Sequence, residues 1–110
     1  MSIRNIITTT LLSACCACAF AQEQRTEVMI ETTAGNIRIA LHNETPAHRD
    51  NFVALVEQNY FDSLLFHRVI EGFMIQGGDP DSRHAQPGQF LGEGGPDYTV
   101  EAEIRTPEIF

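Results

Sequence analysis

Hydrophobic and polar residues alternate along the first part of the chain in a way typical of β-strands. The alternation runs through residues 28–32 and again through residues 37–42, and a period of two places every second side chain on one face of a strand. Residues 33–36 between them read Thr-Ala-Gly-Asn, a turn signal because Gly and Asn tolerate positive φ angles. The pattern predicts an antiparallel hairpin.

A helical period follows the hairpin. Thr45 and Pro46 indicate a helix start, with Thr at the N-cap and Pro at the first helical position, where its missing N–H costs nothing. Apolar residues within 52–56 then recur at i, i+3 and i+4, the spacing of one helix face. Asn59 is expected to end the helix in a left-handed conformation.

Two short apolar runs, residues 66–70 and 73–75, predict two strands joined at Glu71-Gly72. Residues 81–96 hold four glycines and two prolines, which predicts a long surface loop of the kind that is functional or disordered. Residues 98–104 predict one more short strand. Neither an internal repeat nor a linker is visible, so the pattern indicates one small domain.

The N-terminus has the composition of an export signal. Arg4 supplies a positive charge, residues 6–12 form a short apolar stretch, and residues 19–21 read Ala-Phe-Ala, an A-x-A cleavage site. The apolar stretch is too short to span a bilayer as a helix. We therefore expect a signal peptide over residues 1–21, a domain over residues 22–110, and an exported, periplasmic protein.

A second interpretation of the leader stays open. Residues 12–15 resemble a lipoprotein cleavage box in which Cys15 would be acylated, although the well-formed A-x-A site favours cleavage after Ala21. All three cysteines lie in the leader. The domain would then contain no thiol for a disulfide or for a Cys-ligated metal.

The charge of the chain argues against a nucleic-acid partner. The sequence has 7 Lys+Arg against 15 Asp+Glu, a formal net charge of −8, and no lysine, whereas nucleic-acid binding depends on Lys and Arg that neutralise phosphates. The four histidines lack the spacing of a zinc site. Gly77-Gly78 is followed by Pro80 rather than by the lysine and helix of a phosphate loop. The sequence predicts no metal and no cofactor.

Arg68 is the strongest candidate for chemistry, because it lies inside the apolar run 66–70. Desolvating a charge costs several kcal/mol unless a partner compensates it. From the residues alone, Arg68 either forms a structural ion pair or points into a cleft.

Residues 66–70 and 73–79 closely resemble the signature of the cyclophilin-type peptidyl-prolyl cis-trans isomerases, and the flanking sequence agrees from about Val28 to Ile104. The resemblance implies a mainly β fold, an eight-stranded antiparallel β-barrel with two capping helices. About the first half of such a barrel is encoded here. We expect a chain that ends at Phe110 to be a piece of a longer product; a short chain that exists as such is the alternative.

The resemblance also implies roles for single residues. Arg68 would be catalytic, and Gln76 would hydrogen-bond the substrate backbone. Phe73 and Met74 would line the proline pocket, and His67 would lie beside the site in a secondary role. Amide rotation is opposed by about 18–20 kcal/mol. At the twisted transition state the nitrogen lone pair becomes an acceptor, which a fixed guanidinium can bond.

We therefore expect an isomerase that acts on proline-containing polypeptides while they fold in the cell envelope, since uncatalysed X-Pro isomerisation takes tens of seconds or more. A peptide-binding or chaperone-like fragment without turnover is the alternative, and an unfolded remnant is a third. Nothing in the sequence indicates an oligomeric state.

Overall fold

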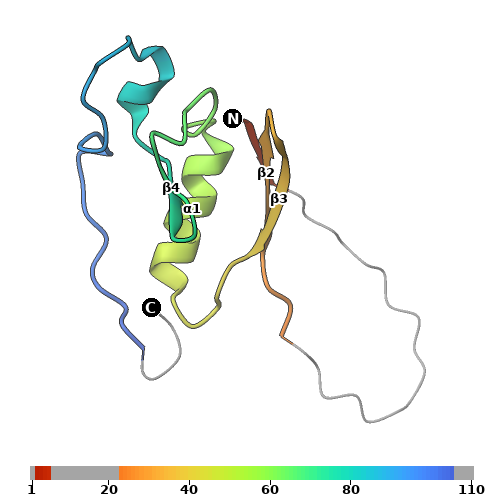
Figure 1. Cartoon of the computed structure of the whole chain (residues 1–110). Coiled ribbons are helices and arrows are strands. Elements are labelled where there is room, and N and C mark those ends of the chain that lie inside the picture. The colour runs from red at the N-terminus through yellow and green to blue at the C-terminus, as the bar shows by residue number, and fades with distance from the viewer. Residues whose placement is uncertain (1, 6–22, 106–110) are drawn as a thin grey trace, which may run out of the picture.

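The computed structural model describes residues 2–5 and 23–105. The elements in chain order are β1 (Ser2–Asn5), β2 (Glu27–Thr32), β3 (Gly35–Ala40), α1 (Pro46–Glu57), β4 (Arg68–Ile70), β5 (Met74–Gln76) and the 3₁₀ helix η1 (Pro80–His84). They form a three-stranded antiparallel sheet in the order β1-β2-β3 and a separate β4–β5 hairpin. Figure 1 shows the sheet beside α1, with the chain after η1 (blue) returning towards the start of the helix. The described part is thus mainly β, with one α-helix.

The hairpin predicted over residues 28–42 is confirmed, because β2 and β3 pair along their whole lengths. Its turn is shorter than expected, since Gly35 and Asn36 belong to β3. The Thr32 hydroxyl closes this turn. It donates to the Gly35 carbonyl at 2.6 Å and accepts the Ala34 N–H at 3.1 Å.

Helix α1 covers the sheet with the face predicted from its period. The buried apolar side chains of the core are Ile3, Val28, Leu55, Val56, Phe61 and Leu64. Leu55 and Val56 belong to α1, and Phe52 of the same helix packs against Phe61 with ring centroids 5.1 Å apart. Burying such side chains stabilises the fold by about 1.5–3 kcal/mol each. The helix is followed by Asn59 at φ +57°, as predicted.

The start of α1 is capped from a distant part of the chain. Thr45 and Pro46 occupy the N-cap and the first turn as predicted, but the Thr45 side chain makes no capping hydrogen bond. The Glu103 carboxylate accepts the N–H groups of Ala47 (2.9 Å) and His48 (2.8 Å) instead, and its second oxygen also lies 2.7 Å from the His48 Nδ1. A carboxylate at this end of a helix satisfies orphan N–H groups and complements the helix dipole.

The strand predicted over residues 98–104 is not formed. This segment runs beside α1, where the Tyr98 hydroxyl donates to Asn51 Oδ1 at 2.6 Å and Glu103 binds the first turn of the helix. Side chains that bond to a helix, rather than a backbone ladder to another strand, therefore fix its position.

The first residues of the chain form β1, within the segment that the sequence assigned to a leader. Ser2–Asn5 pairs with β2, Ile3 is 5% exposed among the core residues, and the Ile3 N–H donates to Asp62 Oδ1 at 3.3 Å. The predicted apolar stretch, Cys15 and the cleavage site before residue 22 lie outside the described residues. In the part of the chain that the structure describes, no helix is long and apolar enough to cross a membrane.

Replacing Ile3 by Ala in the full chain is expected to lower the free energy of unfolding by about 2–5 kcal/mol, because a buried side chain leaves a cavity in the core. Urea denaturation measures this change. Ile104→Ala is the matched control, since Ile104 is 74% exposed and its loss should change stability by no more than about 0.5 kcal/mol. Equal midpoints for the two variants would show that β1 does not pack on the core.

The cap at Glu103 predicts a pH dependence. Burial raises the pKa of Glu103, but the hydrogen bonds from His48 and Ala47 outweigh it and hold the pKa at about 2, below the usual 4.5. A pKa depressed in the folded state contributes stability that is present above the unfolded-state pKa and is lost as the pH falls. We expect the free energy of unfolding to decrease between about pH 4.5 and pH 2.

Urea denaturation at several pH values tests this dependence. Glu103→Gln should flatten the slope over the interval given above, because the amide does not titrate. Glu57→Gln, at the exposed end of the same helix, should keep the wild-type slope. A slope in Glu103→Gln as steep as in the wild type would contradict the assignment of the cap.

Candidate functional site

Arg68 and Gln76 face each other across the β4–β5 hairpin. They are register partners, and Arg68 Nη1 donates to Gln76 Oε1 at 3.5 Å. The turn between the strands is closed by the Phe73 N–H, which donates to the Ile70 carbonyl at 3.1 Å, with Gly72 at φ +70°. The turn lies where the sequence predicted it, and it brings the guanidinium beside the carboxamide.

Arg68 is not a buried ion pair, which was one of the two interpretations of the sequence. Its side chain is exposed, and within residues 2–5 and 23–105 it bonds Gln76 and no carboxylate. The guanidinium is a permanent cation with donors only. Most of its N–H groups therefore remain available to a ligand, which agrees with the interpretation that Arg68 serves a cleft.

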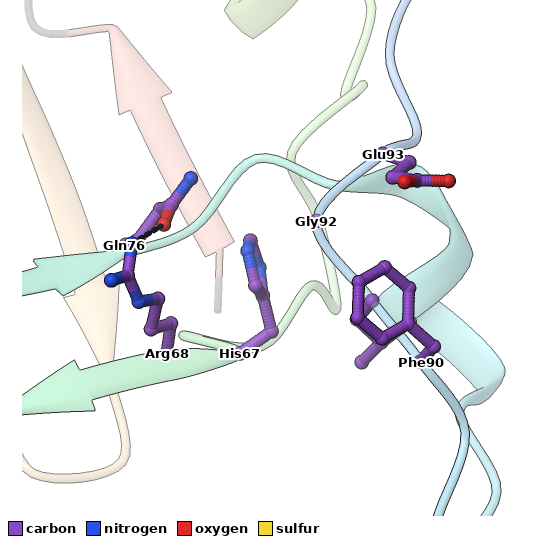
Figure 2. Close-up of a pocket in the computed structure, with 7 residues that line it drawn as sticks. His67, Arg68, Gln76, Phe90, Gly92 and Glu93 are labelled. Carbon is purple, nitrogen blue, oxygen red and sulfur yellow. Dashed lines mark hydrogen bonds between the residues drawn. The ribbon is translucent and has the colours of Figure 1, made fainter.

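A pocket of about 390 Å³ lies in front of this pair. Its lining residues are His67, Arg68, Gln76, Phe90, Leu91, Gly92 and Glu93. Figure 2 shows the beginning of β4 and the end of β5 on one side and the loop that carries Phe90 and Gly92 on the other. The volume falls within the range of about 300–1,000 Å³ that is common for ligand clefts. Three of the predicted site residues, His67, Arg68 and Gln76, are thus brought together.

Phe73 and Met74, the residues expected to contact proline, are not part of the pocket lining. Phe73 lies in the hairpin turn and is 76% exposed. Met74 is half-buried in β5, opposite Ile70. It lies two residues before Gln76, so both side chains share one face of the strand. Their contact with a proline ring stays a prediction.

The wall formed by residues 90–93 was missed in the sequence. Residues 81–96 were expected to be one long loop, but the first part of this segment belongs to the 3₁₀ helix η1. The only signal for a functional role was the length and glycine content of the loop. No single residue in it could be selected, because its position depends on a contact with Asp79.

The Asp79 carboxylate holds the loop that contains residues 90–93. Asp79 is 3% exposed, its Oδ2 accepts the Gly92 N–H at 2.5 Å, and its Oδ1 accepts the Asp81 N–H at 2.8 Å. The bond from Gly92 is the main cause that lowers the pKa of Asp79; burial opposes it, and the N–H groups of Asp81 and Gly94 add to the lowering. A Cβ at Gly94 would overlap the carboxylate, so the loop can approach only as glycine backbone.

Ser82 fixes η1 to the chain that leads into β4. Its hydroxyl is buried, donates to the Asp79 carbonyl at 2.7 Å and accepts the Leu65 N–H at 3.0 Å. Arg83 adds a second attachment, donating to the carbonyls of Tyr60 (2.7 Å) and Asp62 (3.0 Å). Asp79, which anchors the loop, therefore has a fixed position relative to Arg68.

His67 fills the space between Arg68 and the loop, as Figure 2 shows. Both ring nitrogens are buried and have no hydrogen-bond partner in the described residues. A Cβ at Gly92 would lie 3.2 Å from His67 Nε2, and Gly92 has φ +110°. In the described part of the chain, no group of three or more His, Cys, Asp or Glu side chains could hold a metal ion.

Gly92→Ala is expected to destabilise the protein by about 1–3 kcal/mol, because the new methyl group must adopt a left-handed backbone conformation against the imidazole ring. Gly95→Ala is the matched control, since no atom lies within 4 Å of a Cβ at Gly95 and its φ is not positive. Thermal unfolding of both variants measures the difference. Equal melting temperatures would mean that the loop does not pack on His67 as described.

The sequence of this chain is similar to those of known proteins. The profile of the family described as cyclophilin type peptidyl-prolyl cis-trans isomerase/CLD matches residues 27–109. A peptidyl-prolyl cis-trans isomerase of Synechococcus elongatus is 41% identical over 80 residues, covering 72% of this chain and 50% of the relative. Peptidyl-prolyl cis-trans isomerase A of Dickeya dadantii is 46% identical over 61 residues, or 54% of this chain and 32% of the relative.

Peptidyl-prolyl cis-trans isomerase-like 1 of Neurospora crassa is 48% identical over 56 residues, or 50% of this chain and 34% of the relative. No solved structure gives a significant match. The chain belongs to the family of cyclophilin-type peptidyl-prolyl cis-trans isomerases. In these alignments it spans about a third to a half of the length of its relatives.

Proposed function

We propose that this chain supplies the arginine side of a peptidyl-prolyl cis-trans isomerase site, in which Arg68 is the catalytic residue. The observation that carries the proposal is the exposed Arg68 guanidinium at the pocket, bonded to Gln76 and to no carboxylate of the described residues. The family to which the chain belongs supports the proposal.

The proposed chemistry follows from the donors of Arg68. In the planar amide the nitrogen lone pair is delocalised, and rotation costs about 18–20 kcal/mol. When the X-Pro bond twists, the lone pair returns to nitrogen and can accept a hydrogen bond from the guanidinium. This bond exists only near the transition state and therefore lowers the barrier. The Gln76 carboxamide would hold the substrate backbone, and Phe73 and Met74 would contact the proline ring.

The substrates in this proposal are proline-containing segments of exported polypeptides during folding in the envelope. The support for this location is the leader-like sequence of residues 1–21, with its charged start, apolar stretch and A-x-A site. A periplasmic isomerase would accelerate a step that otherwise takes tens of seconds or more.

Binding of proline peptides without turnover is the second candidate. It is favoured by the position of Phe73, which is 76% exposed in the hairpin turn and does not line the pocket. A site that holds a peptide without enclosing its proline ring would bind the substrate and its transition state about equally, and uniform binding does not accelerate a reaction.

Arg68→Ala distinguishes the two candidates in a proline-peptide isomerisation assay on the full chain. If Arg68 bonds the twisted amide, its loss should lower kcat/KM at least about a hundredfold, the scale of removing one donor to a transition state. Peptide affinity, measured by calorimetry, should change far less. Arg38→Ala is the matched control, because Arg38 is also an exposed strand arginine bonded to a polar side chain.

Three outcomes separate the candidates. Catalysis that Arg68→Ala abolishes, and Arg38→Ala leaves intact, is the result expected for an isomerase. Peptide binding with no turnover in the wild-type chain would select the binding module. Turnover that survives in Arg68→Ala would contradict the catalytic role of Arg68.

A further inference from the structure

We infer that Asp79 is a positioning residue, whose buried carboxylate holds residues 90–93 as the wall of the pocket opposite Arg68 and Gln76. The role of Asp79 in shaping the pocket follows from the geometry, whereas any effect of Asp79 on catalysis rests on the proposed function. Asp79 does not line the pocket and would act through the loop.

Few contacts other than the one with Asp79 hold the loop in place. Within the described residues, the hydrogen bond that attaches residues 90–93 to the rest of the chain runs from the Gly92 N–H to the Asp79 carboxylate. Phe90, Gly92 and Glu93 are exposed and Leu91 is half-buried, so apolar burial contributes little to the position of the wall. Losing the carboxylate should therefore release the wall before it affects the core.

Asp79 lies on the same short segment of the chain as the pocket residue Gln76. Gln76 ends β5, and Asp79 follows three residues later, after the chain bends at Gly78 with φ +104°. The Ser82 hydroxyl then ties the Asp79 carbonyl to Leu65, close to the start of β4. The wall is thus fixed relative to the same two strands that carry Arg68 and Gln76.

The contact at residue 79 specifically requires a carboxylate. Both oxygens of Asp79 accept backbone N–H groups, from Gly92 and from Asp81, and a carboxylate is an acceptor at both oxygens. An asparagine has the same shape but presents an NH₂ donor at one of these positions, facing an N–H that is also a donor. Asp79→Asn therefore removes one bond and places two donors together without creating a cavity.

Two titratable side chains, those of His67 and Asp81, lie near the Asp79 carboxylate. His67 lies close enough for its charge to lower the pKa of Asp79, and the Asp81 side chain lies on the same side of the loop, near Gly94. Neither side chain donates a hydrogen bond to Asp79 within the described residues. The backbone amides therefore hold the carboxylate.

The test compares the wild-type chain, Asp79→Asn and Asp97→Asn. Asp97 is exposed and lies in the same loop, after residues 90–93. Its replacement by Asn therefore makes the same change of charge without affecting Asp79. The ¹H–¹⁵N spectrum reports the Gly92 amide, and titration with a proline-containing tetrapeptide reports affinity at Arg68 and Gln76. If the wall is in place only about a tenth of the time in Asp79→Asn, the apparent Kd rises about tenfold.

The expected result for Asp79→Asn is an upfield shift of the Gly92 amide proton and the weaker peptide binding given above. In the isomerisation assay KM should rise by a similar factor, with kcat within about twofold, because the chemical donor Arg68 is untouched. Asp97→Asn should match the wild type. A Gly92 amide and a peptide affinity that are both unchanged in Asp79→Asn would overturn the inference.

Two further measurements apply if Asp79→Asn does not fold or if the wild type shows no turnover. If Asp79→Asn does not fold, the wild-type Gly92 amide proton tests the anchor directly: a resonance clearly downfield of the Gly95 amide proton supports the hydrogen bond to the carboxylate, and a resonance at the position of a solvent-exposed amide overturns it. If the wild type shows no turnover but the amide shift and the affinity respond as expected, the proposed function fails and the positioning role of Asp79 stands.

Discussion

The hydrogen bond from the Gly92 N–H to the Asp79 carboxylate is the constraint on which the pocket depends. A carboxylate that is 3% exposed would be costly to bury without partners, because it leaves water and must be compensated by donors. Backbone amides of η1 and of the following loop supply those donors. The same contact that satisfies the charge therefore brings two distant stretches of the chain together, and the pocket lies along their junction.

Carboxylates fix the C-terminal part of the described chain where apolar burial does not. After η1 the sequence is rich in glycine and proline, and its described residues, up to residue 105, contribute nothing to the buried core. Asp79 attaches the loop at Gly92, and Glu103 attaches the following segment to the N-terminus of α1. In both places the acceptor is a side chain and the donors are backbone amides, so a segment without a hydrophobic face still has a defined path.

The sequence predicted those elements whose stability is local. The β2–β3 hairpin, α1 with its end at Asn59, and the β4–β5 turn at Gly72 follow from period and turn chemistry, and all three are present. The predicted strand over residues 98–104 was wrong because Glu103 bonds a helix 55 residues away in sequence, which no local pattern encodes. The wall at residues 90–93 was missed for the same reason. Arg68 and Gln76 could be selected because a family motif contains them.

Among the described residues Arg68 has no ionic partner, although the chain has a net charge of −8. Asp79, which lies behind the pocket wall, accepts backbone amides at both carboxylate oxygens, and within the described residues Glu93 of the pocket lining forms no ion pair with Arg68. Gln76, the side chain that does meet Arg68, is neutral and accepts one long hydrogen bond. A guanidinium paired with a carboxylate would have its donors engaged in the ground state. Paired with a carboxamide, it keeps the charge and the free N–H groups that a weak, transient acceptor such as a twisted amide nitrogen requires.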